Sequence, residues 1–284
     1  ILMGLAFAVM WSSAFTSARI IVMDASPLLA LSLRYLISGL IGVGIALALG
    51  QSWRLTPAQW RATIIFGVLQ NAVYLGLNFI AMQTIEASLA AIIASTMPLL
   101  VGFAAWAFLG EKLRPLGIAG LFAGVIGVAI IMGARLGGQV DLYGLILCAI
   151  GVVALTAATL LVRGATSGGN FLMVVGLQML VGCVALSIAT LLFETPRIDP
   201  SLRLTLAFAY TCLVPGLAAT VVWFWLVNRI GATRAATFHF LNPFFGVAIA
   251  ALLLGETLGP RDILGVAIIA GGILAVQISR QRKA

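Results

Sequence analysis

The chain has 284 residues, of which 62% are hydrophobic and only 8% are charged, and its formal net charge is +8. A soluble domain carries roughly a quarter charged residues, so this composition and the mean hydropathy of +1.18 predict an integral membrane protein. The excess of Lys and Arg does not indicate a nucleic-acid partner, because these residues are spread over short connections and not gathered on one face.

Ten apolar runs of about 20 residues follow one another along the chain, each long enough to cross a bilayer. Backbone groups inside lipid have to be hydrogen-bonded within their own segment, so we expect all ten runs to be helices. The expected fold class is therefore all-α integral membrane, with connections too short to hold a soluble domain. The predicted spans cover residues 2–20, 27–50, 62–82, 86–109, 115–133, 142–162, 171–193, 203–227, 233–254 and 261–279.

A motif that occurs twice indicates a duplication. Pro98 and the Gly-Glu-x-Leu-x-Pro turn at 110–115 match Pro243 and the turn at 255–260 at a constant shift of 145 positions. The first span matches the sixth at a shift of 140, so each half holds five spans, and the second half is predicted to insert upside down. Inverted repeats are typical of alternating-access carriers. The predicted repeats are residues 1–137 and 138–284.

The connections differ in charge, and this difference predicts the orientation in the membrane. Ten of the sixteen Lys and Arg residues lie on one alternate set of connections and at the C-terminus, and five lie on the other set. Seven of the eight acidic residues lie on the second set. Because positive charge is retained on the cytoplasmic side, both termini are predicted to be cytoplasmic.

On these features the sequence resembles the drug/metabolite transporter (DMT) superfamily, and within it the EamA-type ten-helix carriers. The residues that carry the resemblance are the stretch Trp11-Ser12-Ser13-x-Phe15 and the two copies of Pro…Gly-Glu-x-Leu-x-Pro-x-x-x-x-Gly. The length and the absence of extra domains are similar to bacterial amino-acid and metabolite exporters of the YddG kind. The resemblance implies a multi-pass carrier of the bacterial cytoplasmic membrane.

Polar and aromatic side chains inside the spans are the candidates for a substrate site, because they are costly in lipid and usually face the helix bundle. Asn71, Tyr74 and Asn78 stand three and four positions apart, which places them on one face of a helix. Hydrogen bonding between helices is the alternative role for these residues, and close helix packing is the alternative for Ser95. The candidate substrate-binding residues are Trp11, Ser12, Asn71, Tyr74, Asn78, Ser95, Trp223, His239, Phe240 and Asn242.

Prolines inside three spans predict hinges. Each proline removes a hydrogen bond of the helix and bends it. Pro98 and Pro243 are matched between the repeats and are natural pivots for alternating access. Pro215 and Gly216 in the eighth span are further hinge candidates.

Two ionisable residues lie well inside the spans. Arg34 lies about 10 Å into the second span at 1.5 Å per residue. We expect its side chain to reach back to the membrane surface, with binding of a substrate carboxylate as the alternative. His239 shares a face with Asn242, and packing and functional roles are equally open for it. No second ligand accompanies the histidine, so no metal site, cofactor or catalytic residue is expected.

The candidate residues combine aromatic surface with amides and hydroxyls, which suits an apolar side chain and a zwitterionic head group. We therefore predict a carrier, not an enzyme, that exports small neutral or zwitterionic metabolites, first among them amino acids with aromatic and apolar side chains. Its partners are then the small-molecule substrate and the lipid bilayer, and the oligomeric state is left open between a monomer and a weak homodimer.

Four other functions are weighed against this one. Efflux of drugs or other metabolites is the first alternative, although no span holds an interior acid of the kind a proton-for-cation exchanger needs. A sugar-phosphate or nucleotide-sugar carrier would need several cations at membrane depth, and only Arg34 is available. A channel or a membrane enzyme is disfavoured, since no nucleophile, acid pair or metal set can be assembled at one depth.

Overall fold

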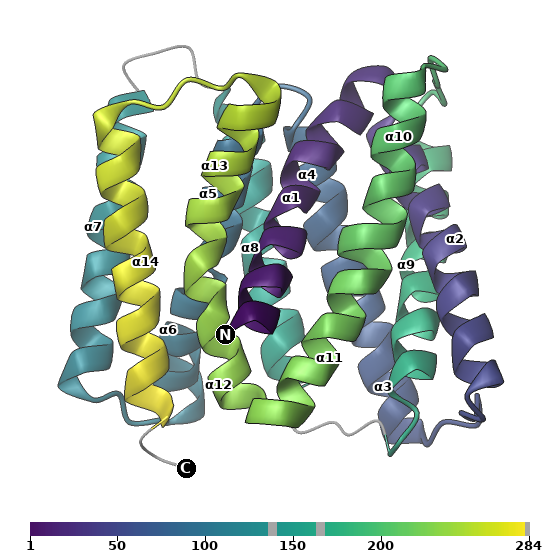
Figure 1. Ribbon diagram of the computed structural model, residues 1–284, viewed down its shortest axis with the longest axis horizontal. Helices are drawn as coiled ribbons and strands as arrows, with labels where there is room; N and C mark the ends of the chain where they lie inside the picture. The colour runs from purple at the N-terminus through teal and green to yellow at the C-terminus, as the bar shows by residue number, and fades with distance from the viewer. Residues whose placement is uncertain (136–140, 163–167, 282–284) are drawn as a thin grey trace. The chain divides into compact units, whose positions relative to one another are not determined.

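The computed structural model describes residues 1–135, 141–162 and 168–281 (Figure 1). Ten helical segments in this part of the chain are long and apolar enough to cross a membrane. Apart from one isolated β-bridge between Ala25 and Ile198, the described residues form no strand pairing. Large apolar side chains such as Phe108, Leu191 and Leu252 are about four-fifths exposed, as lipid-facing residues would be. The predicted all-α membrane fold with ten spans is confirmed.

Six of the ten spans are continuous helices, and the third, fourth, eighth and ninth are interrupted. The continuous helices are α1 (Leu2–Asp24), α2 (Pro27–Ala48), α7 (Pro115–Arg135), α8 (Leu142–Leu161), α9 (Phe171–Phe193) and α14 (Pro260–Gln281). The interrupted spans consist of α3 (Pro57–Phe66), η1 (Gly67–Tyr74) and α4 (Leu75–Ala81); α5 (Ala87–Ser95) and α6 (Met97–Leu109); α10 (Leu202–Thr211), η2 (Cys212–Ala218) and α11 (Ala219–Ile230); α12 (Ala232–Thr237), η3 (Phe238–Leu241) and α13 (Asn242–Leu254).

The interruptions recur at the shift that the sequence repeat predicts. The π-helices η1 and η2 begin 145 positions apart, at Gly67 and Cys212, and so do α6 and α13. Both α6 and α13 end at a glycine in the left-handed conformation, Gly110 with φ 66° and Gly255 with φ 69°. This conformation is costly for residues that have a Cβ atom, which explains the glycine of each Gly-Glu turn.

Matching helices of the two repeats run in opposite directions. α7 and α14 lie side by side (Figure 1). A Cβ atom on Gly120 would lie 2.7 Å from the carbonyl oxygen of Gly272, and one on Gly127 would lie 2.8 Å from that of Gly265. The early part of α7 therefore packs on the late part of α14. Adding 145 to Gly120 and Gly127 gives Gly265 and Gly272, so the repeat relates each of the two contacts to the other. An inverted duplication requires this relation. The predicted boundary between residues 137 and 138 lies outside the described residues.

The helices form two compact units, each containing helices of both repeats. Unit 1 consists of Ile1–Thr16, Thr84–Ile146 and Ala218–Ala284. Unit 2 consists of Ser17–Gln83 and Leu147–Leu217. The α7–α14 pair belongs to unit 1. The antiparallel pair of α2 and α9 belongs to unit 2, where α2 approaches α9 closely at Gly39 and Gly42.

Two predicted span edges differ from the structure by four residues or more. The third span begins at Pro57 and not at residue 62, because Thr56 and Gln59 form a capping box that starts the helix within a polar segment. The first span continues to Asp24 and not to residue 20, so Arg19 lies well inside α1. Its guanidinium donates a hydrogen bond to the carbonyl oxygen of Met82, which satisfies the cation within the helical region.

Candidate functional site

An aromatic cluster surrounds the single histidine in unit 1. We call it the His239 cluster; it consists of Phe7, Trp11, Trp223 and His239. The imidazole centroid lies 5.4 Å from the Phe7 ring, 6.2 Å from the Trp11 ring and 5.2 Å from the Trp223 ring. Phe7 is fully buried, whereas the other three side chains are half-buried. Tilted and edge-on contacts of this kind are favourable, so the rings hold one another in place.

The backbone at His239 departs from the α-helix because of Pro243. Proline has no amide hydrogen, so the His239 carbonyl oxygen lacks its usual donor four residues later. The backbone amide of Asn242 donates to that oxygen instead, which closes the 3₁₀ turn of η3. Gly4 of α1 packs here as well, since a Cβ atom on it would lie 2.2 Å from the ring of Phe238. Proline and glycine together therefore bring the histidine turn against α1.

Asn242 supplies the polar groups of the cluster. Its side-chain nitrogen lies 2.9 Å from Nδ1 of His239, and its backbone oxygen accepts a hydrogen bond of 3.2 Å from the Ser12 hydroxyl. With the amide donating, Nδ1 is the acceptor, which places the imidazole proton on Nε2. The side-chain oxygen Oδ1 of Asn242 is buried without a hydrogen-bond partner. Buried acceptors are normally satisfied, so this oxygen is available to a donor on a bound molecule.

Two further predicted site residues of unit 1 differ in exposure. Ser95 is buried, and its hydroxyl donates a 2.6 Å hydrogen bond to the Ala91 carbonyl oxygen of its own helix. This bond fits the packing alternative for Ser95. Phe240 lies in η3 next to His239 and is half-buried.

Asn71, Tyr74 and Asn78 all lie buried in unit 2, but only Tyr74 and Asn78 share a face, toward Gly151 of α8, whereas Asn71 faces α9. The Asn71 side chain donates to the Gln178 carbonyl oxygen of α9 at 2.9 Å. Asn78 donates to the Tyr74 carbonyl oxygen at 2.8 Å and accepts from the Cys148 thiol of α8 at 3.5 Å. The prediction of one face is wrong for Asn71 because η1 is a π-helix, in which each residue turns the chain by a smaller angle than in an α-helix.

Arg34 lies inside unit 2 and does not reach the membrane surface. Its side chain is only 7% exposed, and the guanidinium carbon lies 5.2 Å from the ring centroid of Tyr35. The expectation that the side chain would extend to the surface is therefore wrong. Packing over the aromatic ring is a favourable alternative for a guanidinium group.

Comparison with known proteins now decides the family. A model of the EamA-like transporter family matches residues 1–133 and 142–278. The chain belongs to the EamA-like transporter family. It is thus a multi-pass membrane transporter.

Individual relatives of this EamA-like transporter are similar over different lengths. The uncharacterised transporters YvbV and YoaV of Bacillus subtilis (strain 168) are 28% and 23% identical, and the matches cover 97% and 93% of this chain and 91% of each relative. The aromatic amino acid exporter YddG of Ancylobacter novellus is 30% identical over 39% of each chain. A solved crystal structure shares the fold, with a TM-score of 0.71 and 22% identity over 100% of this chain and 98% of that one.

The interruptions of this EamA-like transporter coincide with the predicted hinge positions. The fourth span breaks at Thr96, two residues before Pro98, and the ninth span breaks at η3, directly before Asn242 and Pro243. Pro215 and Gly216 lie inside the π-helix η2. That the spans move about these points stays a prediction.

The carboxylate of the Gly-Glu turn has a role that the sequence analysis missed. Both oxygens of Glu256 accept hydrogen bonds from the first amides of α5, at 2.8 Å from Ala87 and 3.0 Å from Ser88. A carboxylate at a helix N-terminus satisfies free amides and opposes the positive end of the helix dipole. Since Glu256 and α5 belong to different repeats, the motif joins the two repeats within unit 1. The sequence feature that could have indicated this role is a glutamate directly after the glycine that ends a helix.

Other acids also bind the ends of helices. Glu194 accepts hydrogen bonds from the Leu28 and Leu29 amides of α2, at 2.9 and 3.1 Å. Asp141 accepts a 2.5 Å bond from the Thr84 hydroxyl and further bonds from the first turn of α8. The hydroxyl bond, followed by those from the backbone amides, holds the pKa of Asp141 below its usual value.

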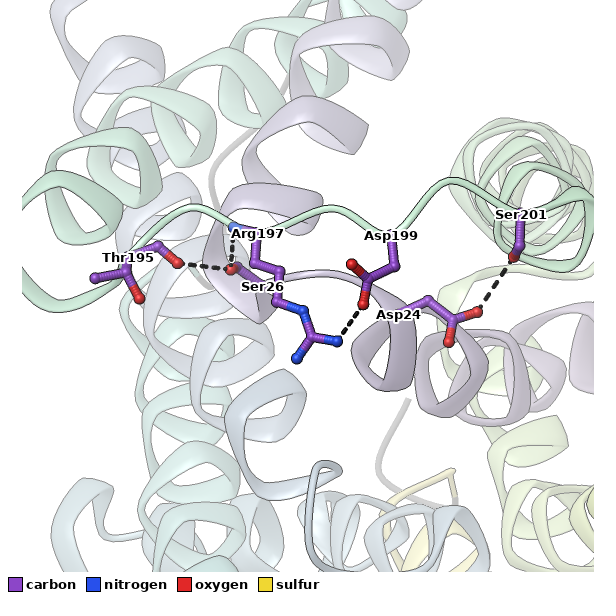
Figure 2. A network of polar contacts seen from close by, with 6 residues as sticks. All are labelled: Asp24, Ser26, Thr195, Arg197, Asp199 and Ser201. Carbon is purple, nitrogen blue, oxygen red and sulfur yellow. Dashed lines mark hydrogen bonds and ion pairs between the residues drawn. The ribbon is translucent and has the colours of Figure 1, made fainter.

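A polar network ties two connections of unit 2 together (Figure 2). The Ser26 hydroxyl donates to the Thr195 carbonyl oxygen at 3.1 Å and accepts from the Arg197 amide at 2.8 Å. The hydrogen bond and charge of Asp199 raise the pKa of Arg197, although both side chains are largely exposed. A hollow of about 300 Å³ lies beside the network. Its lining comes from helix ends and contains none of the predicted substrate residues, so we assign the network to holding the connections together.

Metal ligands are absent from the part of the chain that the structure describes: no group of three His, Cys, Asp or Glu side chains could hold an ion there. Cys148, Cys183 and Cys212 are buried free thiols.

Proposed function

We propose that this transporter exports amino acids and similar small zwitterionic metabolites, including aromatic ones, across the bacterial cytoplasmic membrane. The observation that carries the proposal is the His239 cluster, in which three aromatic rings surround a histidine bonded to Asn242, whose side-chain oxygen has no hydrogen-bond partner. Aromatic faces stack with a substrate ring and attract an ammonium group. A buried amide oxygen provides the ammonium with a hydrogen-bond acceptor.

The comparisons support a carrier and, over a shorter stretch, an amino-acid substrate. The relatives that match along nearly the whole chain are described only as transporters. The relative described as an aromatic amino acid exporter matches 112 residues. The antiparallel packing of matching helices supports alternating access, and the charge distribution supports cytoplasmic termini.

The placement of acidic residues supports transport down the substrate gradient. All eight Asp and Glu residues lie at helix ends or in connections, as the cap of Glu194 on α2 illustrates. Carriers driven by sodium or protons usually hold a carboxylate at membrane depth. We therefore expect His239→Ala to change substrate affinity or specificity more than the pH dependence of transport. Strict proton coupling that disappears in this variant would contradict this mode of transport.

Solute counterflow in proteoliposomes tests the substrate class. Vesicles containing purified protein are loaded with unlabelled L-phenylalanine, and entry of labelled L-phenylalanine is followed over time. We expect saturable counterflow, competition by L-tyrosine and L-leucine, and no competition by glucose 6-phosphate. A channel would give no counterflow overshoot. Counterflow of ethidium or of a sugar phosphate, without that of any amino acid, would overturn the proposal in favour of the alternatives.

A further inference from the structure

Arg34 is a buried cation without a balancing charge in unit 2. It lies seven residues after the start of α2, about 10 Å along the helix axis. Its side chain is 7% exposed, and its Nε atom has no hydrogen-bond partner. A guanidinium keeps its charge even when buried, and an unpaired charge at membrane depth is costly. The position therefore calls for an anion.

The chain itself provides no such anion among the residues that the structure describes, which include all eight acids. Glu194, at the beginning of the same helix, is bound to the amides of Leu28 and Leu29. Asp24 accepts a hydrogen bond from Ser201, and Asp199 pairs with Arg197. No described carboxylate forms an ion pair with Arg34, so its counter-charge has to come from a bound molecule.

A glycine of η2 lies beside the guanidinium of Arg34. Gly216 of η2 faces it, and a Cβ atom on this glycine would lie 3.9 Å from Nη2 of Arg34. The neighbouring Ser38 hydroxyl donates to the Cys212 carbonyl oxygen at 3.3 Å, which fixes η2 against α2. π-Helical turns occur frequently at functional sites. The cation thus lies beside an irregular, glycine-containing turn.

We propose that Arg34 is the centre of an anion site in unit 2 that takes the carboxylate of the transported solute. The planar guanidinium matches a carboxylate through two parallel N–H···O bonds. One unpaired cation balances one carboxylate and leaves the second charge of a phosphate monoester unmatched, so the site favours carboxylic acids. This proposal rests on the proposed amino-acid transport, because a carboxylate is common to those substrates.

Competition by analogues that lack one charged group tests the proposal. In the counterflow assay, 3-phenylpropionate lacks the ammonium group of phenylalanine and phenethylamine lacks the carboxylate. The variants are Arg34→Met, which removes the charge, and Arg34→Lys, which keeps it without the planar fork. Arg19→Met is the matched control, since Arg19 lies in the same unit but donates to the Met82 carbonyl oxygen. Thermal unfolding of each purified variant shows which ones are folded.

For Arg34→Met we expect the KM for phenylalanine to rise by about ten- to a hundredfold, the range for loss of a hydrogen-bonded charge. Competition by 3-phenylpropionate should disappear, while that by phenethylamine persists. Arg34→Lys should recover part of the affinity, and Arg19→Met should keep the preference of the wild type. If 3-phenylpropionate competed with phenylalanine as strongly in folded Arg34→Met as in the wild type, the proposed anion site would be refuted.

Two further outcomes separate the possible failures. If wild-type transport required chloride and Arg34→Met did not, the anion would be chloride, and the carboxylate assignment would be wrong. If wild-type protein carried no amino acid at all, the proposed function would fail with it. If wild-type protein carried phenylalanine and folded Arg34→Met did so with unchanged KM, only the Arg34 site would fail. Should Arg34→Met not fold, the same comparison is made with Arg34→Lys, whose unchanged KM and preference would overturn the site.

Discussion

Replacing Glu256 by alanine should destabilise the protein by about 3 kcal/mol, the lower end for two hydrogen bonds to a charged group. The carboxylate holds the first two amides of α5, and both Ala87 and Ser88 are fully buried. Because alanine cannot accept hydrogen bonds, the two amides would lose their partner in a place that water reaches poorly. We use the lower end because Glu256 itself is half-exposed, so some water can replace it.

Glutamine at the same position separates charge from hydrogen bonding. Glu256→Gln keeps one acceptor oxygen but loses the charge and the second acceptor. The expected loss is about half as large, roughly 1.5 kcal/mol, consistent with one lost bond to a charged group. Glu111 occupies the matching position 145 residues earlier, and α12 begins 145 residues after α5. We therefore expect Glu111→Ala to destabilise the protein to a similar extent.

Thermal unfolding of the purified protein in detergent measures these losses. At roughly 2–4 °C per kcal/mol, Glu256→Ala should lower the Tm by about 6–12 °C. Asp199→Ala is the control, because it removes the same charge from a largely exposed ion pair whose worth is roughly 0–1 kcal/mol. If Glu256→Ala lowered the Tm no more than Asp199→Ala, the carboxylate would not stabilise α5, and our explanation of the Gly-Glu motif would be refuted.

Three further predictions concern orientation, transport and pH. Single cysteines placed in 112–114 and in 256–262 should react with an impermeant reagent from opposite sides of the membrane, and labelling from one side would remove the inverted topology. Trp223→Ala should reduce counterflow in protein that remains folded, whereas Ile268→Ala should mainly lower the Tm; equal effects on both quantities would argue against a substrate role of the tryptophan. Because the folded-state pKa of Asp141 is lowered, its stabilising contribution is complete above its unfolded value near 3.8 and is lost as the pH falls below it. The Tm difference between wild type and Asp141→Asn should therefore shrink below that pH, and a constant difference would contradict this sign.

The sequence was sufficient for the number of spans and for the repeat. Spans are set by the requirement of about 20 apolar residues, which composition alone reveals. The start of the third span was misplaced because residues 57–61 include Gln59 and Arg61, and a capping box, not hydrophobicity, begins that helix. The repeat was visible because Pro and Glu are scarce in an apolar chain. The function of its glutamate was hidden, because its partner amides lie 168 and 169 positions away.

The sequence indicates which residues are candidates for the site, but it does not predict which of them lie together or how they are oriented. Sequence spacing assumes 3.6 residues per turn throughout, and the π-helix η1 breaks this assumption between Asn71 and Asn78. The exposure of Arg34 could not be inferred from its depth in the span. An apolar run around a residue is found both where a helix packs against protein and where it faces lipid, so the sequence does not distinguish the two. Similarly, nothing in the sequence indicated that the Asn242 side-chain oxygen would lack a partner.

The fourth and ninth spans show how one repeat could acquire a site that the other lacks. At the 145-residue shift, Ala94 and Met97 of the fourth span occupy the positions of His239 and Asn242. The break in the fourth span is closed by its own hydroxyls, such as that of Ser95. In the ninth span, a histidine and an amide stand at the same break, and one acceptor is left over. The double variant His239→Ala, Asn242→Met carries the residues of the first repeat at these two positions and should still fold, as thermal unfolding would show. It should lose most phenylalanine counterflow, since the acceptor and the imidazole are gone. Full counterflow in this variant would place the substrate site away from the His239 cluster.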